Sequence, residues 1–92
     1  MLKQRPSARL KRRYLLVEGT RERLEKSILE YLGILGWARA APFFKEAGAG
    51  EWIVAVNREE LVHVRAAFAL SESKIDVKRV SGTLKGLAKH KP

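Results

Sequence analysis

The chain has 92 residues, 46% of them hydrophobic, which is enough for one small domain with a single core and argues against disorder over most of its length. It contains no cysteine, which excludes disulfides, thiol catalysis and cysteine-based metal sites. The formal net charge is +9. No apolar run approaches the roughly 20 residues that cross a membrane, and the basic N-terminus is not followed by the apolar segment of a signal peptide, so we expect a cytoplasmic protein and no membrane partner.

The positive charge is concentrated at the two ends of the sequence. Residues 1–13 hold six basic residues and no acid, and residues 74–92 hold six basic residues and one acid. The residues between them hold seven basic residues against nine acids. Such a division predicts a polyanionic partner, above all nucleic acid, held by the termini, with a contribution to solubility alone as the alternative. The many charges and few amides also fit a heat-adapted, thermophile source.

Residues 1–12 lack apolar periodicity and contain Pro6, which predicts a flexible basic arm ahead of a single domain at residues 13–92. The apolar run in residues 13–18 predicts a first strand. Thr20 is a plausible N-cap for a helix that we expect to end at Gly36. The apolar stripe of this helix has three- and four-residue spacing and consists of Leu24, Ile28, Tyr31, Leu32 and Leu35.

A hairpin is predicted in the middle of the chain. Residues 37–46 are expected to form a second strand, and Pro42 within it indicates an edge strand or a bulge because proline cannot donate to a ladder. Residues 47–50, with two glycines, predict the turn, and residues 51–56 the third strand.

The second half predicts one more helix, one more strand and a short third helix. Asn57 is expected to cap the helix in a capping box with Glu60, and its buried stripe would be Leu61, Val64, Ala67 and Phe68. A fourth strand is expected at residues 74–80 and the short helix at 83–89. The order β-α-β-β-α-β predicts an α+β ferredoxin-like, RRM-like sandwich with an additional short C-terminal helix. One face of its antiparallel sheet would be left for that helix, a partner or RNA.

The sequence gives little support to catalysis. His63 and His90 are its only histidines, and neither lies in a cluster with metal-ligand spacing. No Gly-rich phosphate loop is present. Acylphosphatases share this fold and hold phosphate with an arginine after the first strand, but Arg21, near that place, is typical of a solvated first-turn side chain. We therefore expect no active site, no metal and no cofactor bound by the protein itself.

The aromatic residues leave two interpretations open. RNA-recognition motifs stack bases on aromatics of the central strands, and Tyr14 and Trp52 lie in the first and third strands here. Both are candidates for base stacking or partner contact, although Trp52 fits core packing equally well. Trp37, Phe43 and Phe44 are interpreted as core or interface residues. Backbone binding by charged arms is the better-supported mode.

Three segments, in order, resemble the archaeal ribonuclease P protein component 2, a family shared with eukaryotic ribonuclease P and MRP: RPSARLKRRYL at 5–15, VNREELVHVRAAFAL at 56–70 and VSGTLK at 80–85. The resemblance implies a ferredoxin-like core and a non-catalytic subunit of an RNA enzyme that removes the 5′ leader of precursor tRNA. It implies as partners ribonuclease P RNA, precursor tRNA and other ribonuclease P proteins, especially the barrel-fold component 3. Magnesium would be bound by the partner RNA.

Basic residues near both termini are expected to contact RNA, with two hydroxyls donating hydrogen bonds: Arg9, Lys11, Arg12, Arg13, Arg79, Ser81, Thr83, Lys85 and Lys89. Ser81 and Thr83 would cap the last helix, and its N-terminal amides also attract phosphate. The alternatives are a stand-alone RNA- or ribosome-binding module of the same fold, and a regulatory domain that binds a small ligand.

Overall fold

A computed structural model of the chain describes residues 11–71 and 75–88. Its elements follow the predicted order: β1 (Arg12–Glu18), α1 (Arg21–Ala40), β2 (Phe43–Gly48), β3 (Glu51–Asn57), the 3₁₀ turn η2 (Arg58–Glu60), α2 (Leu61–Leu70), β4 (Asp76–Ser81) and α3 (Leu84–Ala88). Most of the predicted arm, including Arg9, lies outside the described residues, and so do Lys89 and His90. Arg12, assigned to the arm from sequence, is the first residue of β1.

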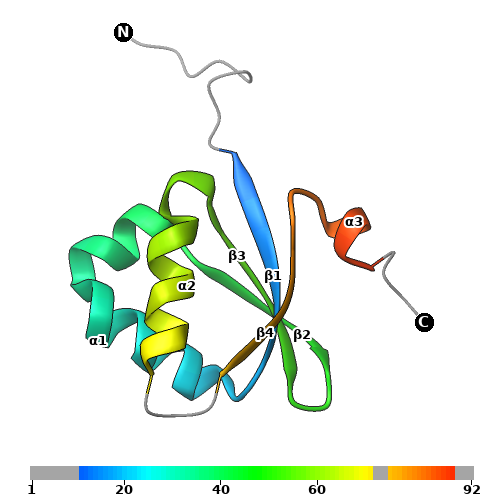
Figure 1. The fold of residues 1–92 in the computed structure, drawn as a ribbon, viewed down its shortest axis with the longest axis horizontal. Coiled ribbons are helices and arrows are strands. Elements are labelled where there is room, and N and C mark those ends of the chain that lie inside the picture. The colour runs from blue at the N-terminus through cyan, green and yellow to red at the C-terminus, as the bar shows by residue number, and fades with distance from the viewer. Residues whose placement is uncertain (1–10, 72–74, 89–92) are drawn as a thin grey trace, which may run out of the picture.

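The four strands form one antiparallel sheet in the order β2-β3-β1-β4, which confirms the ferredoxin-like fold class. Helices α1 and α2 lie on one side of this sheet, and α3 lies on the other (Figure 1). We call these sides the helix face and the open face. Within the described residues, no helix is both long enough and apolar enough to cross a membrane.

The hydrophobic core lies between the sheet and the helices α1 and α2. Strand alternation puts Leu15 and Val17 of β1 on the helix face, where both are fully buried. The helices also share a polar contact, because the buried Ser27 Oγ donates a hydrogen bond of 2.8 Å to the Ala67 carbonyl. The other buried members of this core are Leu24, Ile28, Ala40, Phe44, Val54, Val56, Val64 and Phe68.

Helix α1 is longer than predicted and is broken once. Gly33 has φ 76° and ψ 179°, a backbone conformation open essentially to glycine alone, so the residues after it no longer continue the earlier stripe. Leu24 and Ile28, before the break, are fully buried, whereas Leu35, after it, is 64% exposed. Tyr31, before the break, is also 41% exposed, and its hydroxyl donates a 2.8 Å hydrogen bond to the Leu70 carbonyl. The prediction that Tyr31 and Leu35 belong to the buried stripe is therefore wrong.

The end of α1 is set by Pro42 rather than by Gly36. Ala41 is left-handed, with φ 46°, and its N–H caps the Trp37 carbonyl. A residue that precedes proline avoids the right-handed helical region, which explains a helix end at this place. Residues 37–40 are therefore helical, and their assignment to the second strand was wrong. The strand itself, β2, lies at the edge of the sheet as predicted, directly after Pro42.

Candidate nucleic-acid interface

Basic residues from three separate segments meet at one end of the sheet. The Arg58 amide donates a 2.7 Å hydrogen bond to the Lys11 carbonyl, which joins the start of β1 to the start of η2. The Asn57 amide Nδ2 donates a 2.6 Å hydrogen bond to the Arg39 carbonyl, which brings in the last turn of α1. Lys11, Arg39 and Arg58 all have exposed side chains. We call these three residues, with Arg13 and Lys85, the basic end.

Arg12 also lies at this end, but its guanidinium is bonded inside the fold. Its Nη1 donates to Asn57 Oδ1 at 2.8 Å, and its Nη2 donates to the carbonyls of Ala41 and Ala55 at 2.9 and 3.1 Å. Three acceptors hold the planar group in one orientation. Arg12 was expected to contact RNA, and the structure gives it a second role that sequence did not predict, holding the chain ends of β1, α1 and β3 together.

The predicted capping box at Asn57 is wrong. Asn57 lies before the 3₁₀ turn, and its side chain makes no capping hydrogen bond. It is instead 8% exposed and bridges Arg12 and the Arg39 carbonyl. Glu60 pairs with His63, its Oε1 lying 2.9 Å from the imidazole Nδ1. Asparagine offers both an acceptor and a donor, and these two tertiary contacts orient its amide away from the capping position.

Arg13 connects the start of β1 to the stretch Ser81-Gly82-Thr83. Its Nη1 donates to the Arg12 carbonyl at 3.1 Å, and a Cβ atom placed on Gly82 would lie 3.3 Å from the same Nη1. The guanidinium therefore lies against Gly82, where a side chain would crowd it. Residues almost seventy positions apart in the chain thus place a guanidinium beside the stretch that carries the two hydroxyls.

The hydroxyls of this stretch cap α3 as predicted. Thr83 Oγ1 accepts from the Gly86 amide at 2.9 Å, and Ser81 Oγ accepts from the Thr83 amide at 3.2 Å. Gly86 makes the close packing possible, since a Cβ there would lie 2.5 Å from Ser81 Oγ. A hydroxyl that accepts one bond can still donate its own proton, so donation to a phosphate oxygen stays a prediction.

The two aromatic candidates lie on opposite faces of the sheet. Trp52 pairs in register with the buried Val17 and packs against the core on the helix face. Tyr14 pairs with Ala55 and Ser81, in the alternate register, and is half-buried on the open face. Of the two, only Tyr14 lies on the face where sheet stacking could occur. Of the other predicted core or interface aromatics, Trp37 packs against the core.

Arg79, a predicted RNA contact, and Arg21, compared above with the acylphosphatase arginine, lie in different environments. Arg79 pairs with Leu16 on β1, and its Nε is buried with no hydrogen-bond partner among the described residues. Arg21 is explained without a phosphate: its Nε lies 2.8 Å from Glu25 Oε2, and its guanidinium lies 5.2 Å from the centroid of the Phe44 ring. Cation–π and ion-pair contacts of this kind are structural, which removes the resemblance of Arg21 to the acylphosphatase arginine.

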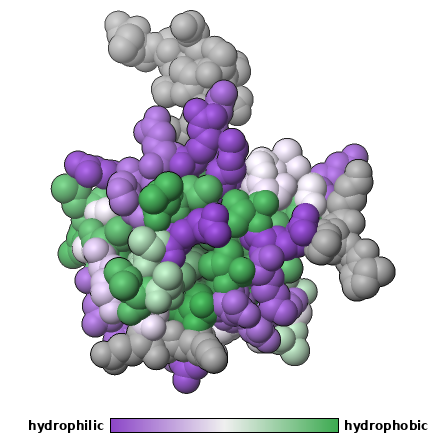
Figure 2. Space-filling model, viewed as in Figure 1, coloured by the Kyte–Doolittle hydropathy of each residue, from purple (hydrophilic) through white to green (hydrophobic). Residues whose placement is uncertain are grey.

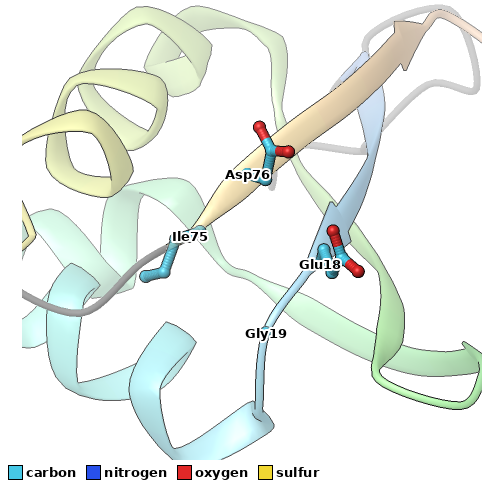
Figure 3. A pocket seen from close by; sticks show the side chains of 4 residues that line it. All are labelled: Glu18, Gly19, Ile75 and Asp76. Atoms are coloured by element: carbon cyan, nitrogen blue, oxygen red, sulfur yellow. The ribbon is translucent and has the colours of Figure 1, made fainter.

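The opposite end of the sheet is acidic. Glu18 is paired in register with Glu51 on one side and Asp76 on the other, so three carboxylates form one row. The Lys78 ammonium lies 3.7 Å from oxygens of both glutamates and offsets part of this charge. Figure 3 shows Glu18 and Asp76 on neighbouring strands beside a cavity that Gly19 and Ile75 also line. A polyanion is therefore repelled from this end and attracted to the other.

Sequence reasoning missed Arg39 and Arg58. Both lie in the middle of the chain, where acids outnumber bases, so counting charge along the sequence hides them. The fold places them beside Lys11 at the start of β1, through the hydrogen bonds of Asn57 and Lys11. Hydrophilic residues gather in Figure 2 at the end where β1 begins, while hydrophobic ones are prominent over α1 and α2. In the part of the chain that the structure describes, no group of three or more acidic or histidine side chains could hold a metal ion.

Comparison of the chain with protein-family models gave no match, and comparison with curated protein sequences gave none either.

Proposed function

We propose that the protein is an RNA-binding, non-catalytic subunit of ribonuclease P, of the archaeal component 2 type, which supports the catalytic RNA in removing the 5′ leader of precursor tRNA. The observation that carries the proposal is the basic end, built from β1, α1, the β3–α2 junction and α3, opposite an acidic end. Such segregation fits a partner that presents phosphates from one direction.

The physical role follows from the charge of a folded RNA. A large RNA that folds on itself brings phosphates close together, and their repulsion opposes the compact form. Cations already held in place on a protein surface bind the compact form better than the open one, so they shift the population toward the active RNA. Less magnesium is then needed for the same fraction of folded RNA, while the RNA keeps the catalytic chemistry.

The proposed assembly contains the ribonuclease P RNA, precursor tRNA and the barrel-fold component 3, and we place it in the cytoplasm. The hydrophobic residues exposed on the helices leave room for a protein neighbour on the helix side of the sheet: Leu29, Ile34, Leu35, Val62 and Leu70 are between 44% and 81% exposed. Contact of RNA at the basic end and of protein on the helices would not compete for the same surface.

Reconstitution tests the proposal. Ribonuclease P RNA is combined with component 3, with or without this protein, and leader cleavage of precursor tRNA is measured across a magnesium titration. We expect the protein to lower the magnesium concentration at half-maximal cleavage. The double variant Arg39→Ala, Arg58→Ala should lose most of this effect, while Arg23→Ala, Lys26→Ala, which removes the same charge from the first half of α1, should retain it. Cleavage curves that coincide with and without the protein would contradict the proposal.

The same titration separates the alternatives. A stand-alone RNA- or ribosome-binding module would bind RNA with a steep salt dependence but leave cleavage unchanged. A small-ligand-binding regulatory domain would show neither the RNA affinity nor the salt dependence.

A further inference from the structure

An aromatic row crosses the open face of the sheet. The in-register neighbours across the four strands, in spatial order, are Phe43, Ala55, Tyr14 and Ser81. Residues opposite one another in adjacent strands project to the same side, so the two rings share a surface with small residues between and beside them. Phe43 and Tyr14 are two strands apart, which corresponds to about 10 Å.

Phe43 is the most exposed aromatic residue of this row. Its ring is 62% exposed, whereas the next residue, Phe44, points into the core and is 8% exposed. The sequence placed both in a core or interface, and the strand alternation divides them. The ring of Phe43 therefore lies on the open face at the edge of the sheet, outside the core.

A second row, two residues further along each strand, has an apolar centre and basic edges. Its members in spatial order are Lys45, Ile53, Leu16 and Arg79. Ile53 and Leu16 are half-buried, and the two cations lie on the edge strands β2 and β4. In this row, apolar groups therefore occupy the two central strands, and cations occupy the two edge strands.

An acidic row and helix α3 bound this part of the open face. Beyond the second row comes the row of Glu51, Glu18 and Asp76, which repels an anion. Helix α3 packs on β4 and β1 with Leu87 buried to 4% exposure, and it carries the exposed Lys85. The uncovered part therefore runs from α3 toward Phe43 at the edge.

We propose that the open face binds unpaired nucleotides of RNA, with Phe43 and Tyr14 stacking on bases and Lys45 and Arg79 contacting the adjoining phosphates. The proposal rests on the RNA binding put forward above, but not on which RNA is bound. Stacked bases match an apolar centre and phosphates match cationic margins, whereas a second copy or a protein partner gives no reason for cations on both edges. A base-paired duplex hides its base faces and offers nothing to Phe43.

Fluorescence anisotropy with two labelled probes tests this: a 12-nucleotide oligouridine strand, and a fully paired 12-base-pair RNA duplex at the same salt concentration. Phe43→Ala should weaken binding of the single strand about tenfold and leave duplex affinity unchanged. Phe43→Trp should restore single-strand binding, since a larger ring stacks at least as well. The matched control is Leu35→Ala, which truncates a residue of similar exposure, 64% against 62%, on α1.

Several outcomes would overturn the proposal. They are unchanged single-strand affinity of Phe43→Ala, an equal loss for both probes, the same loss in Leu35→Ala, or no binding of the single strand by the unaltered protein. Sedimentation that shows Phe43→Ala dissociating a dimer would assign the ring to a second copy instead. Thermal unfolding of each variant shows whether it is folded. Phe43→Trp keeps a ring at this position, so its single-strand affinity tests stacking even if Phe43→Ala is destabilised. Failure of the cleavage assay with retained single-strand selectivity would refute the ribonuclease P proposal alone.

Discussion

Replacing Asn57 by alanine should destabilise the protein through the loss of two side-chain hydrogen bonds. The side chain is 8% exposed, accepts a 2.8 Å bond from the Arg12 guanidinium and donates a 2.6 Å bond to the Arg39 carbonyl. Alanine removes both bonds and leaves the part-buried Arg39 carbonyl and one guanidinium N–H without these partners.

The magnitude follows from the two bonds. A hydrogen bond to a charged group contributes about 1.5–3 kcal/mol and a neutral one about 0.5–1.5 kcal/mol. Arg12 keeps its two carbonyl acceptors and is only half-buried, so the lower part of the sum applies. We expect a loss of about 2–3 kcal/mol in the free energy of unfolding, or a fall in Tm of about 10–20 °C for a domain of this size.

Urea unfolding measures this loss, with the denaturant slope unchanged if the native fold is kept. A double-mutant cycle with Arg12→Ala should be non-additive by about 1 kcal/mol or more, because each single change already breaks the shared bond. Glu59→Ala, at an exposed neighbouring position, is the control and should leave the midpoint in place. A loss below about 0.5 kcal/mol for Asn57→Ala, or strict additivity with Arg12→Ala, would refute the structural role assigned to this pair.

Three other predictions concern the cap, the basic end and the helix contact. The double variant Ser81→Ala, Thr83→Ala should lose about 1–2 kcal/mol of stability from the cap, and RNA affinity that stays unchanged would limit this stretch to capping. Arg39→Ala and Arg58→Ala should each reduce the slope of log affinity for RNA against log salt by about 1, as expected for one phosphate contact. Ser27→Ala should cost about 1 kcal/mol, measured by thermal unfolding, through its lost bond to the Ala67 carbonyl.

The predictions on the salt slope and on the helix contact each have a counter-test. For the salt slope, Arg23→Ala and Lys26→Ala remove charge from the other end of α1 and should leave the slope as it was; an equal decrease would mean that net charge alone binds the RNA. For the helix contact, an unchanged Tm of Ser27→Ala would contradict the prediction. It would mean that the Ala67 carbonyl accepts a hydrogen bond from another donor in the variant.

The order of the elements could be predicted from sequence because local signals agree with the fold. The apolar runs of β1 and β3, the glycine-containing turn between β2 and β3 and the helical stripe of α2 each indicate one type of local structure. The end of α1 could not be placed, since two signals competed there. Gly36 resembles a C-terminal stop, yet glycine is tolerated inside a helix at a cost of about 1 kcal/mol, whereas Pro42 excludes helix at the residue before it.

The candidate site was predictable only where charge is continuous in the chain. Lys11, Arg13 and Lys85 belong to basic segments and were found, although Arg12 in the same run has a structural contact that no sequence pattern reveals. Arg39 is placed by its bond to Asn57, a residue that sequence reasoning assigned to a cap, and Arg58 by its bond to the Lys11 carbonyl. The alternation of Phe43 and Phe44 depends on where β2 begins, and the misplaced helix end concealed it.

The break at Gly33 divides the backbone of α1 into two helical segments, which we expect to open as separate cooperative units. Residues 21–32 are tied to α2 through the buried Ser27, while residues 34–40 carry the highly exposed Ile34 and are held at their end by the Asn57 bond to the Arg39 carbonyl. Native-state amide exchange should therefore change abruptly at Gly33, with the second unit exchanging at a lower free energy. A polyanion bound at Arg39 would slow amide exchange in residues 34–40 and leave exchange in residues 21–32 unchanged. Comparing the two halves of α1 would therefore show at which end of the helix the ligand binds.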